Sequence, residues 1–160
     1  MRKTAFIDSQ NLYRAVDSQG YRIDYRRFRQ FLSGKGVSRA IMFFGYTQTQ
    51  RRLYDYLCRC GFELMFRDVE LYEGRLKSNV DIFLTITVMD MLQANDFDSA
   101  MLVTSDGDFF DLIERLKAEG KFSDVLSPGR PAQCSKLVTR AANGHIFFFP
   151  DVKHKFANPK

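Results

Sequence analysis

Short apolar runs alternate with segments of helical periodicity along this chain, and the alternation constrains its fold more than any other feature. Runs too short for helices predict strands at residues 4–7, 40–44, 62–66, 100–103, 122–126 and 145–149. The intervening patterns predict helices near residues 12–16, 24–34, 48–61, 80–92, 105–120 and 134–142. Strands separated by helices are typical of βαβ units, so we expect an α/β fold with a mostly parallel sheet covered on both faces.

The clearest strand-to-helix junction is Leu102-Val-Thr-Ser-Asp-Gly-Asp-Phe109. Its apolar start predicts a buried strand, and Ser105 with Asp108 has the Ser-x-x-acid spacing of a helix start. Apolar residues then recur at helical spacing until Gly120, where a helix is expected to stop. Asp106 and Asp108 are therefore predicted on a tight turn at the carboxyl end of a strand, where open α/β sheets form their binding sites.

Length and composition indicate a single globular domain, which we place at residues 1–150 with a tail at 151–160. The three cysteines form no C-x-x-C pair, so no structural zinc site is expected. We find no secretory signal and no apolar run of membrane-spanning length. We therefore expect a cytoplasmic protein that does not contact membranes, and its oligomeric state is left open, a homodimer included.

The chain is basic, with a formal net charge of +5 and a sequence pI near 9.2. Such a charge favours an anionic partner, although clusters of basic residues also commonly form solvated helix faces. The basic residues that we place around the predicted site are Arg14, Arg51, Arg52, Lys136 and Arg140. Tyr13 and Tyr46 follow strand ends, where they either stack on unpaired bases or, as we favour, pack half-buried.

Two further acids lie where they could join the pair after the fourth strand. Asp8 directly follows the first strand, and Asp81 opens the helix at 80–92. In a doubly wound sheet, the positions after neighbouring strands converge on one edge. Crowded carboxylates stay ionised only if a cation compensates their charge, and oxygen ligands suit Mg²⁺ or Mn²⁺.

Each acid also has a purely structural explanation. Asp8 can cap the helix that follows it, and Asp81 with Ser78 forms a second Ser-x-x-acid pair like the one of Ser105 and Asp108. Taken singly, helix capping explains each acid better than catalysis does. The four acids together favour a metal site, provided that they meet in space.

These motifs together resemble the NYN domain, a branch of the PIN-like ribonucleases. The resemblance spans most of the chain and is carried by Phe6-Ile-Asp-Ser-Gln-Asn-Leu12, Lys77-Ser-Asn-Val-Asp-Ile82, Leu102 to Phe109 and, more loosely, Ser135 to Phe147. It implies a three-layer α/β/α sandwich whose acidic cluster binds a divalent metal ion and cleaves RNA. The metal activates water for attack on the phosphate.

The resemblance also assigns residues. The catalytic and metal-binding acids carry over as Asp8, Asp81, Asp106 and Asp108. Asn11 and Ser105 carry over as polar neighbours that orient an acid or a water molecule, and Lys77 is a candidate contact to the RNA phosphate or a solvated loop charge. The chain departs from the family where Asn79 replaces a common glycine and where Asn143 replaces a common acid.

Other acid-based sites fit less well. A haloacid-dehalogenase phosphatase needs a second Asp at position 10, where this chain has Gln10. A Toprim site matches Asp106-Gly-Asp108 but prefers Glu at the position of Asp8, and an integrin-type site needs Asp-x-Ser-x-Ser. The remaining alternative is a non-catalytic RNA-binding or regulatory module that keeps the same fold.

Overall fold

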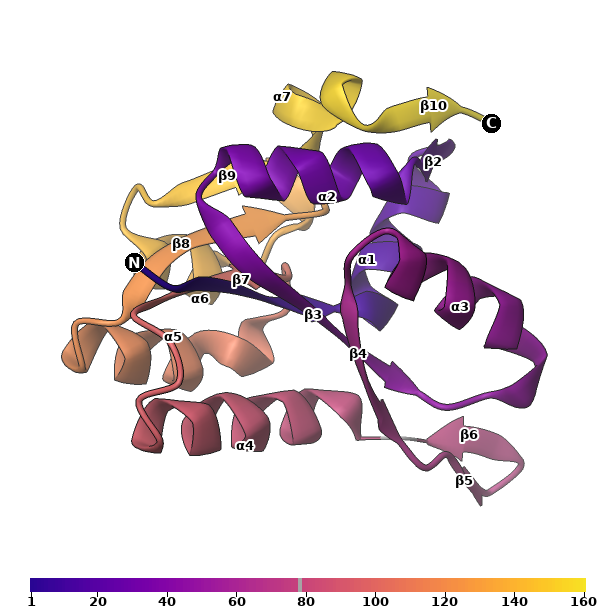
Figure 1. The fold of residues 1–160 in the computed structure, drawn as a ribbon, viewed down its shortest axis with the longest axis horizontal. Coiled ribbons are helices and arrows are strands. Elements are labelled where there is room, and N and C mark those ends of the chain that lie inside the picture. Colours follow the sequence, from indigo (N-terminus) through magenta and orange to yellow (C-terminus); the bar gives the residue numbers. More distant parts are fainter. Residues whose placement is uncertain (78) are drawn as a thin grey trace.

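A six-stranded parallel sheet forms the centre of the computed structural model, which describes residues 1–77 and 79–160, without the side chains of residues 76 and 77 (Figure 1). Its spatial order is β4 (Glu63–Arg67), β3 (Val37–Gly45), β1 (Lys3–Asp8), β7 (Ser99–Val103), β8 (Phe122–Ser127) and β9 (Ile146–Phe148). All neighbouring strands in this sheet pair in parallel. The predicted parallel α/β sheet is confirmed.

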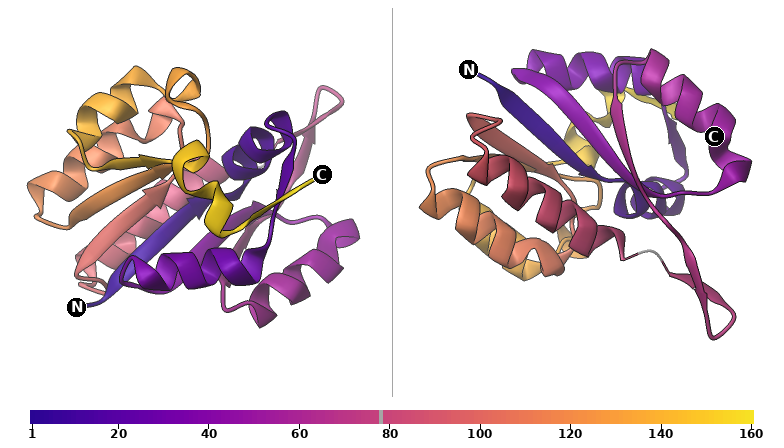
Figure 2. Two further views of the ribbon diagram at one scale, coloured as in Figure 1. Left: turned by 90° about the horizontal axis from the view of Figure 1, so that it is seen from above. Right: turned by 60° about the horizontal axis from the view of Figure 1, so that its bottom comes forward.

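Helices cover both faces of the sheet, as the two views in Figure 2 show. One face packs against α1 (Ser9–Ser18), α2 (Tyr25–Gly34), α3 (Arg51–Arg59) and the short α7 (Phe149–Val152). The other face packs against α4 (Val80–Gln93), α5 (Phe110–Ala118) and α6 (Lys136–Ala142). Each face has its own apolar cluster, because alternate side chains of a strand point to opposite sides. The fold is therefore a three-layer α/β/α sandwich.

The chain reverses its direction of travel across the sheet between β1 and β7. From β1 it moves outward through β3 to β4, then returns by way of α4 to β7 and continues to β8 and β9. In open α/β sheets such a reversal leaves a crevice beyond the carboxyl ends of the two central strands. β1 ends at Asp8, and the turn containing Asp106 follows β7.

The apolar pattern did not predict the structure of three segments: the connection after β4, residues 21–23, and the segment after α7. The polar connection after β4 contains an antiparallel hairpin of β5 (Glu70–Tyr72) and β6 (Arg75–Lys77). The segment predicted as a tail continues through a 3-10 turn, η4 (Lys153–Lys155), into β10 (Ala157–Pro159), which pairs with β2 (Tyr21–Ile23). Phe156 anchors this segment, with its fully buried ring against Phe28 and Phe149.

No helix within residues 1–77 and 79–160 is long and apolar enough to cross a membrane.

Candidate active site

Asp8 is the buried centre of the candidate site. It is the last residue of β1 and caps α1, because its Oδ1 accepts a hydrogen bond from the backbone N–H of Asn11 at 3.2 Å. Its Oδ2 accepts a hydrogen bond from the hydroxyl of Thr104 at 3.2 Å. Only 7% of Asp8 is exposed. The predicted capping role is confirmed, and the two carboxylate oxygens are held by different elements, one by the first turn of α1 and the other by Thr104 directly after β7.

The turn after β7 is fastened to α1 by Asn11. The Oδ1 of Asn11 accepts from both the backbone N–H and the hydroxyl of Ser105, at 2.9 and 3.0 Å. Ser105 is therefore not a helix cap. Asp106 caps the next 3-10 turn, η2 (Gly107–Phe109), by accepting the Asp108 N–H at 2.9 Å. The predicted Ser105/Asp108 capping box is wrong, because the Ser105 hydroxyl is engaged across the crevice.

Gly107 lets the acidic turn pack tightly against the start of α6. A Cβ atom on Gly107 would lie 2.6 Å from the Oγ of Ser135, closer than Cβ atoms approach other atoms in proteins, and 3.2 Å from its Cβ, which is a tight contact. The backbone N–H of Ser135 also donates to the carbonyl oxygen of Ser105 at 3.0 Å. The turn between Asp106 and Asp108 is therefore fixed from both sides, by α1 and by α6.

Asp81 reaches the site from the first turn of α4. The helix begins at Val80, and its N-cap is Asn79 in the left-handed conformation, with φ 45° and no side-chain capping bond. The predicted helix over residues 80–92 is confirmed. The predicted capping box of Ser78 and Asp81 needs the acid at the third helical position, but Asp81 is the second residue of α4, so this prediction is wrong for Asp81. Ser78 itself lies outside the described residues. The left-handed backbone explains how asparagine replaces the family's glycine, since both tolerate this conformation.

The electrostatics of Asp8 link it to two other acids. The pKa of Asp8 is raised to about 6, mainly by burial and to a smaller extent by repulsion from Asp106 and Asp81, while the hydrogen bonds from Asn11 and Thr104 oppose the rise. Asp106 and Asp81 therefore both lie near enough to Asp8 to repel its charged form. No ion pair with Lys or Arg joins these acids or Asp108 among the described residues.

The acids do not form a ready-made coordination shell. In the part of the chain that the structure describes, no three His, Cys, Asp or Glu side chains are grouped closely enough to hold a metal ion. Asp106 and Asp81 are half-buried, whereas Asp108 is exposed. Lys77 ends β6, and its side chain lies outside the described residues.

Asn143, the second departure from the family pattern, ends α6 in the left-handed conformation with φ 48°. It lies at the opposite end of α6 from Ser135, the residue that packs on the acidic turn. Its side chain therefore has a local reason to be asparagine, because this residue type adopts the left-handed conformation more readily than most.

Thr104 is the site residue that the sequence motifs missed. It is 2% exposed, and its hydroxyl donates to Asp8 while accepting the N–H of Asp106 at 3.1 Å. A polar residue directly between an apolar strand and two acids is the signal that could have indicated this role. Tyr13 packs on Tyr25 and Phe44, in agreement with the favoured interpretation, and Tyr46 lies partly exposed against Tyr54 and Phe66.

The doubly wound parallel sheet, the helices on both of its faces and the acids at its reversal point have the architecture of a PIN-like α/β domain. The sequence matches the NYN domain over residues 3–149, and the chain belongs to this family of PIN-like, nuclease-type domains. It is 25% identical over 138 residues to the low amplitude and bright protein LabA of Synechococcus elongatus, across 79% of this chain and 73% of that protein. A crystal structure of a protein of unknown function from Vibrio parahaemolyticus has the same fold, with a TM-score of 0.77, 24% identity, and coverage of 98% of this chain and 96% of that one.

Proposed function

We propose that this NYN domain is a metal-dependent ribonuclease that hydrolyses RNA phosphodiester bonds at Asp8, Asp81, Asp106 and Asp108. The observation that carries the proposal is the unfavourable environment of Asp8. It is a buried carboxyl group with two other acids near it and no ion-paired base among the described residues. The ionised form of such a group is costly even though Asp8 also caps α1, and a ligand that compensates the negative charge best explains its presence.

A divalent cation fits the chemistry of these side chains. The donors are carboxylate oxygens only, which Mg²⁺ and Mn²⁺ prefer, and Mg²⁺ usually keeps several waters and is held by one or two carboxylates plus substrate phosphates. Asp8, Asp81, Asp106 and Asp108 are the residues that would hold the ion. A bound cation would supply Lewis-acid chemistry, polarising the phosphate and acidifying a water.

The polar neighbours then have defined tasks. Thr104 and the backbone of Asn11 fix the orientation of Asp8, because each bonds a different carboxylate oxygen. Asn11 holds the turn of Asp106 in place through Ser105. These contacts orient the acids before RNA arrives, which reduces the cost of arranging them during the reaction.

Exposed basic residues support RNA as the substrate. Five exposed basic side chains on α1, α3 and α6 flank the candidate site in the prediction from sequence and form no ion pair with a described acid: Arg14, Arg51, Arg52, Lys136 and Arg140. An acidic centre repels a polyanion, so contacts to flanking phosphates must come from such residues. The positive formal charge of +5 favours the same partner.

The test is cleavage of labelled single-stranded RNA with Mn²⁺ or Mg²⁺. We expect the wild type to cut and Asp106→Asn to lose at least about 100-fold of the rate, because this change removes a carboxylate from the candidate metal site. Asp111→Asn is the matched control, since Asp111 is an exposed acid in the first turn of α5. Cutting that persists in excess EDTA would contradict the metal mechanism.

The absence of a compact acidic group among the described residues favours one alternative, an RNA-binding module without turnover. Such a module would retain RNA equally with and without Mn²⁺ and would leave it intact. Thermal unfolding separates the two functions without an activity measurement. A ribonuclease site requires Mn²⁺ to raise the melting temperature of the wild type and to have a smaller effect on Asp106→Asn.

A further inference from the structure

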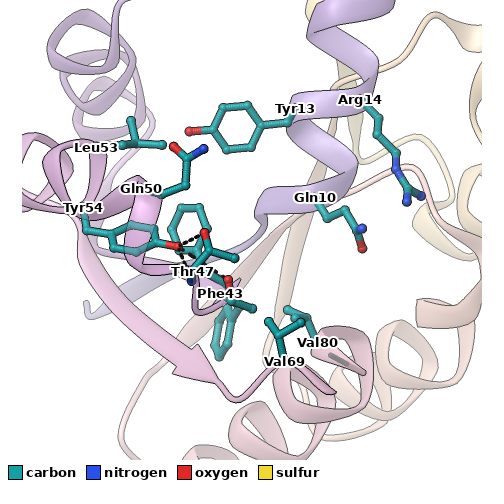
Figure 3. A pocket seen from close by; sticks show the side chains of 12 residues that line it. Gln10, Tyr13, Arg14, Phe43, Thr47, Gln50, Leu53, Tyr54, Val69 and Val80 are labelled. Carbon is teal, nitrogen blue, oxygen red and sulfur yellow. Dashed lines mark hydrogen bonds between the residues drawn. The ribbon is translucent and has the colours of Figure 1, made fainter. Parts of the chain in front are cut away.

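A cavity of about 370 Å³ opens between α1, β3 and the start of α3 (Figure 3). Its size lies within the roughly 300–1,000 Å³ of typical small-molecule sites. The walls are mostly apolar or aromatic, and include Phe43, Leu53, Val69 and Val80. Polar groups are few, as in sites that recognise a flat, largely apolar ligand with a few hydrogen-bonding edges.

The backbone fixes this cavity next to the candidate active site. Phe43, in its wall, is the direct register partner of Asp8 in the β1/β3 pairing. Gln10 follows Asp8 by two residues, and Val80 immediately precedes Asp81. A ligand in the cavity therefore lies beside residues that directly neighbour Asp8 and Asp81, at the same edge of the sheet.

One wall is rigid. The hydroxyl of Tyr54 accepts the backbone N–H of Thr47 at 3.2 Å and lies 3.5 Å from the carbonyl oxygen of Gly45, to which it donates. The Tyr54 ring packs on Phe44 and Phe66, with ring centroids 5.2 and 4.7 Å apart. Because both its ring and its hydroxyl are held, Tyr54 keeps its place whether or not a ligand is present.

The polar groups that line the cavity are suited to the edge of a nucleobase. Gln10, at the start of α1, and Gln50, at the end of η1 (Gln48–Gln50), are exposed amides that can each donate and accept a hydrogen bond. The one charged side chain in the lining is Arg14, one helical turn after Gln10. An amide pair with a single cation matches a neutral base that is followed by a phosphate, and it does not match a phosphate inside the cavity.

We propose that this cavity is a base-binding subsite, which takes one unpaired nucleobase of the RNA adjacent to the scissile phosphate. This inference rests on the proposed function and makes it more specific. The apolar walls hold the flat faces of the base, the amides of Gln10 and Gln50 contact its edge, and Arg14 contacts the next phosphate. A base inside a duplex cannot enter without leaving its stack, so the substrate class is single-stranded RNA.

The test measures binding and cleavage separately. Binding of a labelled single-stranded oligoribonucleotide is measured in EDTA on an Asp106→Asn background, with oligonucleotides that lack the base at one position at a time. We expect one abasic position to weaken binding about tenfold. Gln50→Leu should bind the intact RNA more weakly than the parent protein does. Removing the base at the same position should then cause no further loss of binding. Gln10→Leu provides a second variant with the same expectation.

Gln48→Leu is the matched control, because Gln48 is an exposed glutamine of the same 3-10 turn that does not line the cavity. It must bind like the parent protein at every abasic position. Cleavage is measured on proteins that retain Asp106. If they cleave while no abasic position depends on Gln10 or Gln50 for binding, the subsite is overturned and the ribonuclease function stands. A base-dependent effect of these variants without cleavage supports the subsite and contradicts the hydrolytic function. Equal binding of duplex and single-stranded RNA also overturns the subsite.

Discussion

The hydroxyl of Thr104 donates to the carboxylate of Asp8 across 96 residues of sequence, at 3.2 Å. This bond joins the carboxyl ends of β1 and β7, the two strands between which the chain reverses direction. The same hydroxyl accepts the N–H of Asp106 at 3.1 Å. Thr104 therefore connects the buried acid to the acidic turn, and it does so without neutralising either charge.

Replacing Asp8 by asparagine should stabilise the protein in the absence of metal. A carboxyl pKa raised from 3.8 to about 6 corresponds to a cost of up to about 3 kcal/mol at neutral pH. Asp8→Asn removes this cost and retains an oxygen that can cap α1. We expect urea unfolding in EDTA at pH 7.5 to give a gain of about 1–3 kcal/mol.

The sign of the pH dependence follows from the raised pKa of Asp8. Between about 3.8 and about 6, folded Asp8 holds a proton that the unfolded chain releases. Its favourable contribution is full below the lower value and is lost as the pH rises through the upper one. The advantage of Asp8→Asn should therefore shrink at acidic pH. A variant less stable than the wild type at pH 7.5 would refute this account, and Asp111→Asn serves as the exposed control.

Asn11→Ala should destabilise the protein more than Ser105→Ala. The first change leaves the buried Ser105 N–H without its acceptor, which costs about 1–3 kcal/mol. The second removes only the hydroxyl bond, which costs about 0.5–1.5 kcal/mol. Denaturant unfolding of the two variants measures the difference. Equal losses would mean that the backbone bond from Ser105 to Asn11 contributes little.

Gly107→Ala should damage the acidic turn because the new Cβ would overlap Ser135. We expect a loss of about 1–3 kcal/mol, typical of overpacking, together with weaker Mn²⁺ stabilisation. Ser135→Gly makes room and costs only a few tenths of a kcal/mol as a cap change. The double variant should recover most of the loss in thermal unfolding. A purely additive pair would show that the overlap is not the cause.

Phe156→Ala should lower the free energy of unfolding by about 3–5 kcal/mol, although Phe156 lies only four residues before Lys160. Its ring is fully buried against Phe28 and Phe149. Phe147→Ala is the control, because that ring is 36% exposed on β9. Urea unfolding should show a much smaller loss for the control. Similar losses would mean that the segment after α7 does not contribute to the core.

Local signals predicted most of the elements and failed where a side chain had two possible partners. Asp8 follows a strand and caps the next helix as expected, because capping needs only a backbone N–H three residues away, and Asp24 caps α2 in the same way. Ser105 has the spacing of a cap as well, yet it bonds Asn11 from another element. The burial of Phe156 was also missed, since its partners lie far away in the sequence.

The sequence by itself determined the alternation of strands and helices, the parallel sheet and the placing of acids after strand ends, because these depend on periodicity and on neighbours along the chain. Only the tertiary structure decided that Asp8 is buried beside Asp106 and Asp81, and that a cavity adjoins them. Burial, repulsion between charges and the shape of a cavity arise between residues that are distant in sequence. Their strength depends on separation in space and on the exclusion of water, which no local pattern encodes.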